Sequence, residues 1–61
     1  MTTIKSIDIC NKTIKLNKIK DLYNVTLQVN EEIQKVLPAY DLNMAMVIFE
    51  EVEKELYRNF N

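Results

Sequence analysis

Hydrophobic residues recur every three or four positions in the last third of the chain. This spacing places them on one face of a helix with 3.6 residues per turn. The stripe consists of Leu42, Ala45, Met46, Phe49, Val52, Leu56 and Phe60. Both phenylalanines of the chain lie in it, so this segment supplies much of the bulky apolar volume. The pattern predicts an amphipathic helix over residues 42–59.

A second stripe with the same spacing occupies the middle of the chain. Its members are Leu22, Val25, Val29, Ile33 and Val36. The β-branched residues in it lower helix propensity, but the regular spacing favours a helix over residues 18–37. Pro38 would end this helix, because proline cannot donate a backbone hydrogen bond and restricts the residue before it. Residues 38–41 would then join two antiparallel helices, with Asp41 or Asn43 capping the second one.

The first 17 residues alternate between polar and apolar positions, which is typical of strands. A two-residue turn at Asn11-Lys12 would make a β-hairpin and pair Asp8 with Lys15 across it. The same register places four aliphatic side chains on one face: Ile7, Ile9, Ile14 and Leu16. The alternative is that residues 12–20 extend the following helix, since Leu16 and Ile19 are three positions apart.

These elements together predict a mainly α protein with a minor β component. A short N-terminal β-hairpin (1–17) would precede an antiparallel two-helix hairpin (18–37 and 42–59) in a single domain, residues 1–61. A chain of this size buries only about 60% of its unfolded surface, so its stability is marginal. Cys10 is the sole cysteine and allows no disulfide within the chain, so oligomerisation is the remaining way to gain stability.

The net charge of −1 conceals an asymmetry between the two parts of the chain. Residues 1–20 carry five lysines against Asp8, a net of +4, and residues 21–61 carry a net of −5. The two segments are expected to attract each other within the fold or across a dimer. The five lysines are accompanied by neither arginine nor an aromatic residue, which disfavours nucleic-acid binding.

Residue types needed for catalysis and cofactor binding are missing. The chain has no histidine and no glycine, so it lacks the commonest general base and any glycine-rich phosphate loop. One cysteine cannot supply a zinc site, and the glutamates between 50 and 55 point in several directions around a helix. We therefore expect no enzyme activity, no catalytic residues, no cofactor and no metal.

Each predicted helix carries apolar residues away from its main stripe. Val47 and Met44 fall nearly opposite Phe49, Ile48 lies on its flank, and Leu27 falls opposite Val29. These residues predict a protein interface made of Leu27, Met44, Val47 and Ile48. A homodimer or a foreign protein partner could cover it.

Composition also bears on location and source. No apolar run is long enough to cross a membrane and no signal-peptide core is present, so we expect a cytoplasmic protein without membrane contact. Ile, Lys and Asn occur seven times each, and their AT-rich codons indicate a low-GC bacterium or one of its phages.

The segment Ser6–Asn17, SIDICNKTIKLN, is similar to the lead-in of many small phage proteins. It resembles the N-termini of tail assembly chaperones from low-GC phages, over roughly the first third of the chain. The resemblance implies a protein that binds other phage proteins and has no catalytic residues. The chain departs from that family in its short length and in lacking the glycine usual at the turn.

The predicted function is that of a small non-catalytic bacterial or phage accessory protein that binds another protein, as a homodimer. Two alternatives remain open. The acidic helix could mimic nucleic acid and inhibit a host or defence protein, or the lysine-rich lead-in could contact phosphates as part of a nucleic-acid-linked regulator.

Overall fold

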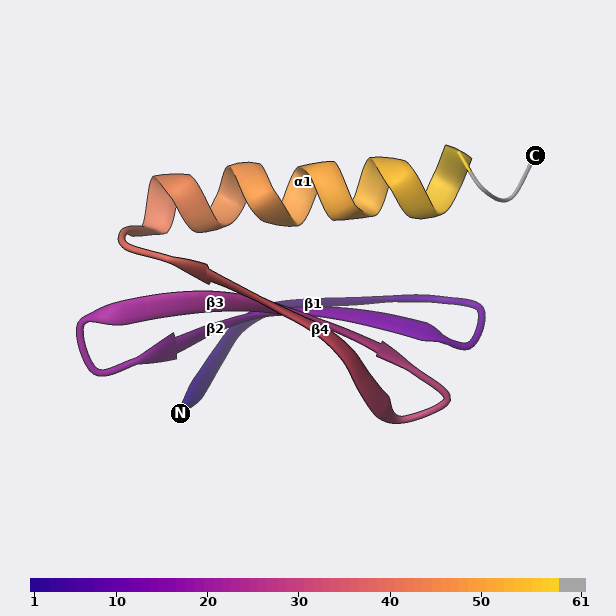
Figure 1. Ribbon diagram of the computed structural model, residues 1–61, viewed down its shortest axis with the longest axis horizontal. Coiled ribbons are helices and arrows are strands. Elements are labelled where there is room, and N and C mark those ends of the chain that lie inside the picture. Colours follow the sequence, from indigo (N-terminus) through magenta and orange to yellow (C-terminus); the bar gives the residue numbers. More distant parts are fainter. Residues whose placement is uncertain (59–61) are drawn as a thin grey trace.

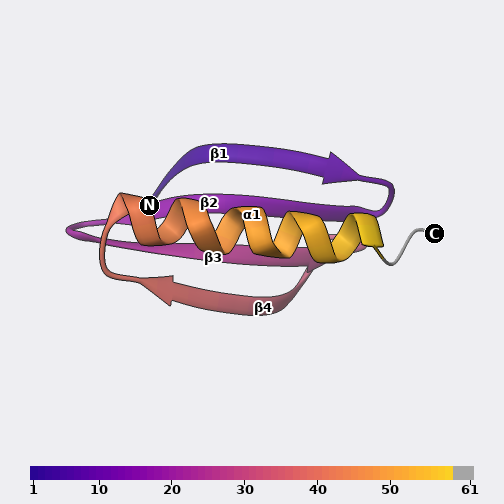
Figure 2. The same cartoon turned by 90° about the horizontal axis from the view of Figure 1, so that it is seen from above.

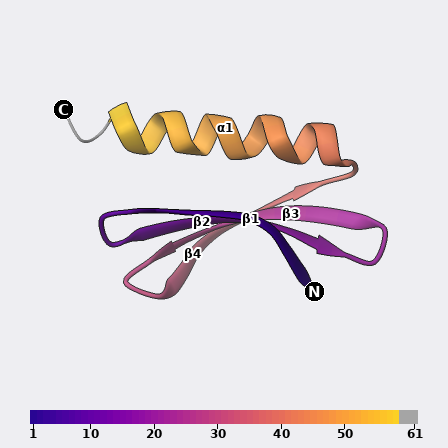
Figure 3. The same cartoon turned by 180° about the vertical axis from the view of Figure 1, so that it is seen from behind.

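The computed structural model describes residues 1–58, which form one antiparallel sheet and one helix (Figure 1). The elements are β1 (Thr2–Ile9), β2 (Lys12–Ile19), β3 (Leu22–Val29), β4 (Glu32–Ala39) and α1 (Leu42–Arg58). The strands lie side by side in chain order, β1-β2-β3-β4. Helix α1 runs above β2 and β3, with β1 and β4 to either side (Figure 2). Views from opposite sides show the helix over the same single face of the sheet (Figures 1 and 3).

The predicted mainly α fold is wrong, because residues 18–37 form strands rather than a helix. They comprise the end of β2, all of β3 and most of β4. In β3 the apolar residues Tyr23, Val25, Leu27 and Val29 alternate with Asn24, Thr26 and Gln28. This period of two is as regular as the spacing of three and four, and β-branched side chains pack well on a pleated sheet.

Pro38 lies inside β4 and does not end a helix. Because β4 is an outer strand of the sheet, one side of its backbone forms no ladder hydrogen bonds. Proline is accommodated there, where its missing N–H costs no pairing. Pro38, which was expected to end a helix, therefore marks an outer strand of the sheet.

The three hairpins turn tightly without any glycine. Positive φ angles occur at Cys10 (56°), Lys20 (56°), Asn30 (53°) and Glu31 (70°). The first turn is Cys10-Asn11 rather than the predicted Asn11-Lys12, since Ile9 pairs with Lys12. Two-residue hairpin turns need residues with positive φ angles, so these four residues occupy positions where glycine is favoured.

The shifted turn changes the pairs across the first hairpin but not the faces. Asp8 pairs with Thr13 instead of Lys15, and its Oδ1 accepts a 2.7 Å hydrogen bond from the Thr13 hydroxyl. The pairing partner of each residue moves by two positions, which keeps side chains on the same side of the sheet. Ile7 and the buried Ile9, Ile14 and Leu16 therefore share the face that the helix covers.

The core lies between the sheet and α1. Phe49 is fully buried against Ile14, Leu16 and Val25, which are also fully buried. Asp41 caps the helix, as predicted, by accepting a 2.8 Å hydrogen bond from the Met44 amide at its Oδ1. Asn59 of the predicted helix and Phe60 of the hydrophobic stripe lie outside the described residues.

Candidate protein-binding surfaces

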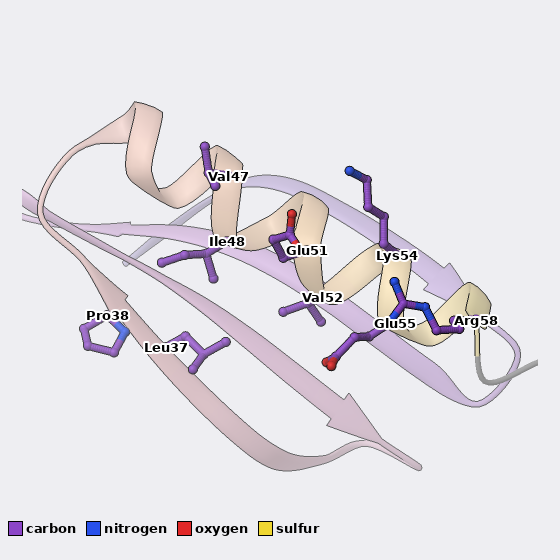
Figure 4. Close-up of a pocket in the computed structure, with 9 residues that line it drawn as sticks. All are labelled: Leu37, Pro38, Val47, Ile48, Glu51, Val52, Lys54, Glu55 and Arg58. Carbon is purple, nitrogen blue, oxygen red and sulfur yellow. The ribbon is translucent and has the colours of Figure 1, made fainter.

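A groove of about 440 Å³ lies between α1 and the outer strand β4 (Figure 4). Leu37 on the strand and Ile48 and Val52 on the helix are half-buried and give it an apolar floor. Ile48 and Val52 extend toward β4 (Figure 4). The other lining residues are Pro38, Val47, Glu51, Lys54, Glu55 and Arg58.

The rim of this groove carries charges of both signs. Glu51, Lys54, Glu55 and Arg58 are all exposed. No ion pair or hydrogen bond joins these four side chains to a partner within residues 1–58. Lys54 points away from β4, whereas Glu55 reaches toward it (Figure 4). The rim is thus open to polar contacts from another molecule.

The other flank of the helix is closed by a side chain. The Lys5 ammonium of β1 lies 4.8 Å from the centroid of the Phe49 ring. This cation–π contact and the aliphatic stem of the lysine cover the aromatic ring where β1 meets the helix. In the part of the chain that the structure describes, the groove thus lies on the β4 flank, and the β1 flank carries this lysine contact instead.

The structure brings three of the four predicted interface residues onto one helix surface. Val47 and Ile48 line the groove, with Val47 59% exposed, and Met44, 44% exposed, lies in the preceding turn. Leu27 is not among them. It is half-buried on the helix-covered face of β3, opposite Ile14, and packs against the core.

A second surface is the sheet face that the helix does not cover, referred to below as the open face. Its residues follow from the pairing, because side chains alternate between the two faces along each strand. Ile19, Leu22, Ile33 and Val36 lie there and are 41–59% exposed. We call these four residues the apolar strip. The helical interpretation of residues 18–37 missed it by assigning three of them to the core; a period-two reading of β3 and β4 would have found it.

The open face also carries a row of hydrogen-bonded polar side chains next to the apolar strip. Asn17 is only 2% exposed and accepts a 3.0 Å hydrogen bond from the Thr3 hydroxyl. Its amide nitrogen donates to Asn24 Oδ1 at 2.9 Å and to Thr26 Oγ1 at 3.4 Å. Among residues 1–58, no buried side-chain nitrogen or oxygen lacks a partner.

The two outer strands are poorly suited to pairing with a further strand. Each contains a one-residue bulge, at Ile4 in β1 and at Gln34 in β4. In β4, Pro38 also removes a backbone donor. Because bulges and proline protect sheet edges from added strands, contact with another protein is expected on the groove or the open face.

The five N-terminal lysines do not form one surface. Lys5 lies over Phe49, and Lys18 lies 5.9 Å from the centroid of the Tyr23 ring, both on the helix-covered face. Lys15 projects from the open face, and Lys20 lies in a turn. Within residues 1–58, no three Cys, Asp or Glu side chains cluster closely enough to hold a metal ion. The single helix of that part is not long and apolar enough to cross a membrane.

Comparison with protein-family models, curated proteins and solved structures finds no match. The resemblance of Ser6–Asn17 to phage chaperones therefore stays a prediction.

Proposed function

We propose that this chain is a small non-catalytic accessory protein, cytoplasmic and of bacterial or phage origin, that binds another protein in the groove between α1 and β4. A homodimer is part of this proposal. The observation that carries it is the combination of an apolar floor with an exposed rim of both charge signs, whose side chains have no partner within residues 1–58. Protein interfaces have this organisation, with an apolar centre surrounded by polar contacts.

The groove defines the chemistry of its partner. Leu37, Ile48 and Val52 offer contact to aliphatic side chains, and about 440 Å³ accommodates more than one of them. The rim presents two carboxylates and two cations, so the partner segment is expected to carry charges of both signs beside its apolar anchors. An amphipathic segment of another protein meets both requirements.

The two alternatives have weaker support in the structure. Lys54 lies between two glutamates of α1 and Arg58 follows them, so the helix does not present the continuous negative surface of a nucleic-acid mimic. Lys15 lies on the open face and the other lysines of β1 and β2 lie on the helix-covered face, so they do not form one continuous positive surface for a phosphate backbone.

Affinity capture from the native host, followed by mass spectrometry, tests the proposal with three forms of the full chain. Val47→Glu adds a charge to the groove. Tyr57→Glu adds the same charge to an exposed residue that lies outside the groove on the same helix. We expect the wild type and Tyr57→Glu to retain a protein that Val47→Glu loses. Equal capture by all three forms, or no specific capture by any, would contradict the proposal.

The captured protein should then be purified and titrated by calorimetry. Direct binding that weakens at least tenfold with Val47→Glu and less than twofold with Tyr57→Glu would support the groove as the site. The circular dichroism of both variants should match the wild type, because both positions are more than half exposed.

A further inference from the structure

We propose that the apolar strip on the open face binds a second copy of this chain, with the two sheets packed face to face around a two-fold axis. This inference rests on the proposed function only in that both include a homodimer. It assigns the dimer to the sheet and leaves the α1–β4 groove free for a different protein.

The open face is divided between two kinds of surface. Its polar part takes in most of β1, β2 and β3, with Asp8, Thr13, Lys15 and Gln28 among its residues. Its apolar part is the strip, which lies at the β2–β3 turn and along β4 and exposes Leu22 (54%), Ile33 (59%) and Val36 (53%). An antiparallel sheet with one face in water normally places polar residues on that face. The polar part follows this rule and the apolar strip does not, which indicates a covered surface.

The members of the strip follow one another from the β2–β3 turn along β4. Ile19 and Leu22 are paired across the turn between β2 and β3. Together with Val36 and Pro38 of β4 they line a hollow of about 200 Å³. Ile33 continues the strip along β4, opposite Gln28. A hollow flanked by exposed aliphatic side chains can receive the aliphatic side chains of an identical strip.

Covering the part of this face around Asn17 requires little loss of hydration from polar groups. The side-chain amide of Asn17 is already buried and hydrogen bonded to Thr3, Asn24 and Thr26. A buried polar group is costly only when it lacks a partner, and this network supplies its own. A second sheet can therefore pack against the network without leaving its polar atoms unsatisfied.

The strip suits an identical copy better than the groove does. It contains no charged residue, so two strips brought together by a two-fold axis place no like charges in contact. If a two-fold axis brought two grooves together, the charged side chains of Glu51, Lys54, Glu55 and Arg58 would lie close to the water-excluded centre of the interface. Charged residues are depleted at the centres of homodimer interfaces.

The whole open face, with the apolar strip and the polar part together, is large enough for a weak dimer. Eight-residue strands are about 27 Å long, and four of them span roughly 15–19 Å, so this face covers on the order of 400–500 Å² before side-chain relief is counted. Two such faces total about 800–1,000 Å², which is close to the lower limit for a specific interface. An interface of this size is typical of weak association.

Sedimentation equilibrium of the full chain, from about 5 to 500 µM, tests the inference. Val36→Lys places a charge in the strip, and Val47→Lys places it in the groove; both residues are more than half exposed. We expect a wild-type dimer, an increase in Kd of at least tenfold for Val36→Lys, and a change below twofold for Val47→Lys. If circular dichroism shows that Val36→Lys is unstable, Ile33→Lys places the charge elsewhere in the strip and should raise Kd by the same factor.

Two results would overturn the inference, and the capture test of the proposed function is separate from both. One is a wild type that stays monomeric at every concentration, which would also remove the homodimer from the proposed function. The other is a dimer dissociated by Val47→Lys and not by Val36→Lys, which would place self-association in the groove. Conversely, a dimer that depends on Val36, together with no groove-dependent protein capture, would support the inference and contradict the proposed partner site.

Discussion

The Lys5 ammonium lies 4.8 Å from the centre of the Phe49 ring and closes one flank of the helix. On the opposite flank, no cation–π contact among residues 1–58 bridges α1 and β4, and the groove occupies that position. One lysine thus distinguishes a sealed side of the core from a side available to a partner.

Lys5→Ala should lower the free energy of unfolding by about 0.5–1 kcal/mol, the usual value of an exposed cation–π contact. Lys5→Met keeps the aliphatic stem over the ring and should lose less. Urea denaturation of the two variants measures the difference. Equal stability of wild type and Lys5→Ala would show that the contact contributes nothing.

Phe49→Ala should destabilise the protein by about 3–5 kcal/mol, because it removes the largest fully buried side chain and leaves a cavity. A domain of 61 residues has a stability of roughly 3–9 kcal/mol, so this variant should be largely unfolded at 37 °C. Thermal melting followed by circular dichroism checks this. Tyr57→Ala, at an exposed site of the same helix, serves as the control and should melt near the wild type.

Asn17→Ala should cost about 1–3 kcal/mol, since it removes one acceptor and one donor group from a buried network. Asn24→Ala removes only one of these hydrogen bonds, at a half-buried residue, and should cost less. Chemical denaturation compares the two. A larger loss for Asn24→Ala would show that Asn17 is not the centre of the network.

Glu31→Gly should raise the free energy of unfolding by about 0.5–1 kcal/mol. Its φ of 70° is unfavourable for a residue with a Cβ atom and free of steric cost for glycine. Glu31→Ala removes the same charge but keeps the Cβ atom, so it should give no such gain. An equal gain from both substitutions would assign the effect to charge instead of backbone conformation.

The helix over Leu42–Arg58 and the hairpin of β1 and β2 could be predicted from the sequence, because each has one dominant periodicity. Residues 18–37 have two. Leu22, Val25 and Val29 fit a helix, while Tyr23, Val25, Leu27 and Val29 fit a strand. Turn chemistry normally resolves this ambiguity, but Lys20-Asp21 and Asn30-Glu31 contain no glycine. The sequence therefore carries no glycine that would mark turns at these positions.

The groove and the apolar strip could be predicted only where the helix or strand that carries them could be predicted. The sequence predicts the helix that carries Met44, Val47 and Ile48, but it does not predict the groove beside them, because the groove also needs Leu37 of β4. The apolar strip was missed because it depends on strand alternation in β3 and β4. Leu27 lies on the helix-covered face for the same reason.

Isotope-filtered NMR on the dimer tests the face-to-face arrangement most directly. One sample mixes equal amounts of ¹³C-labelled and unlabelled chain at a concentration well above Kd. We expect intermolecular methyl contacts among Ile19, Leu22, Ile33 and Val36, and none involving Val47. Intermolecular contacts confined to Val47 and Ile48, or none at a concentration where sedimentation shows a dimer, would contradict the assignment of the dimer to the open face.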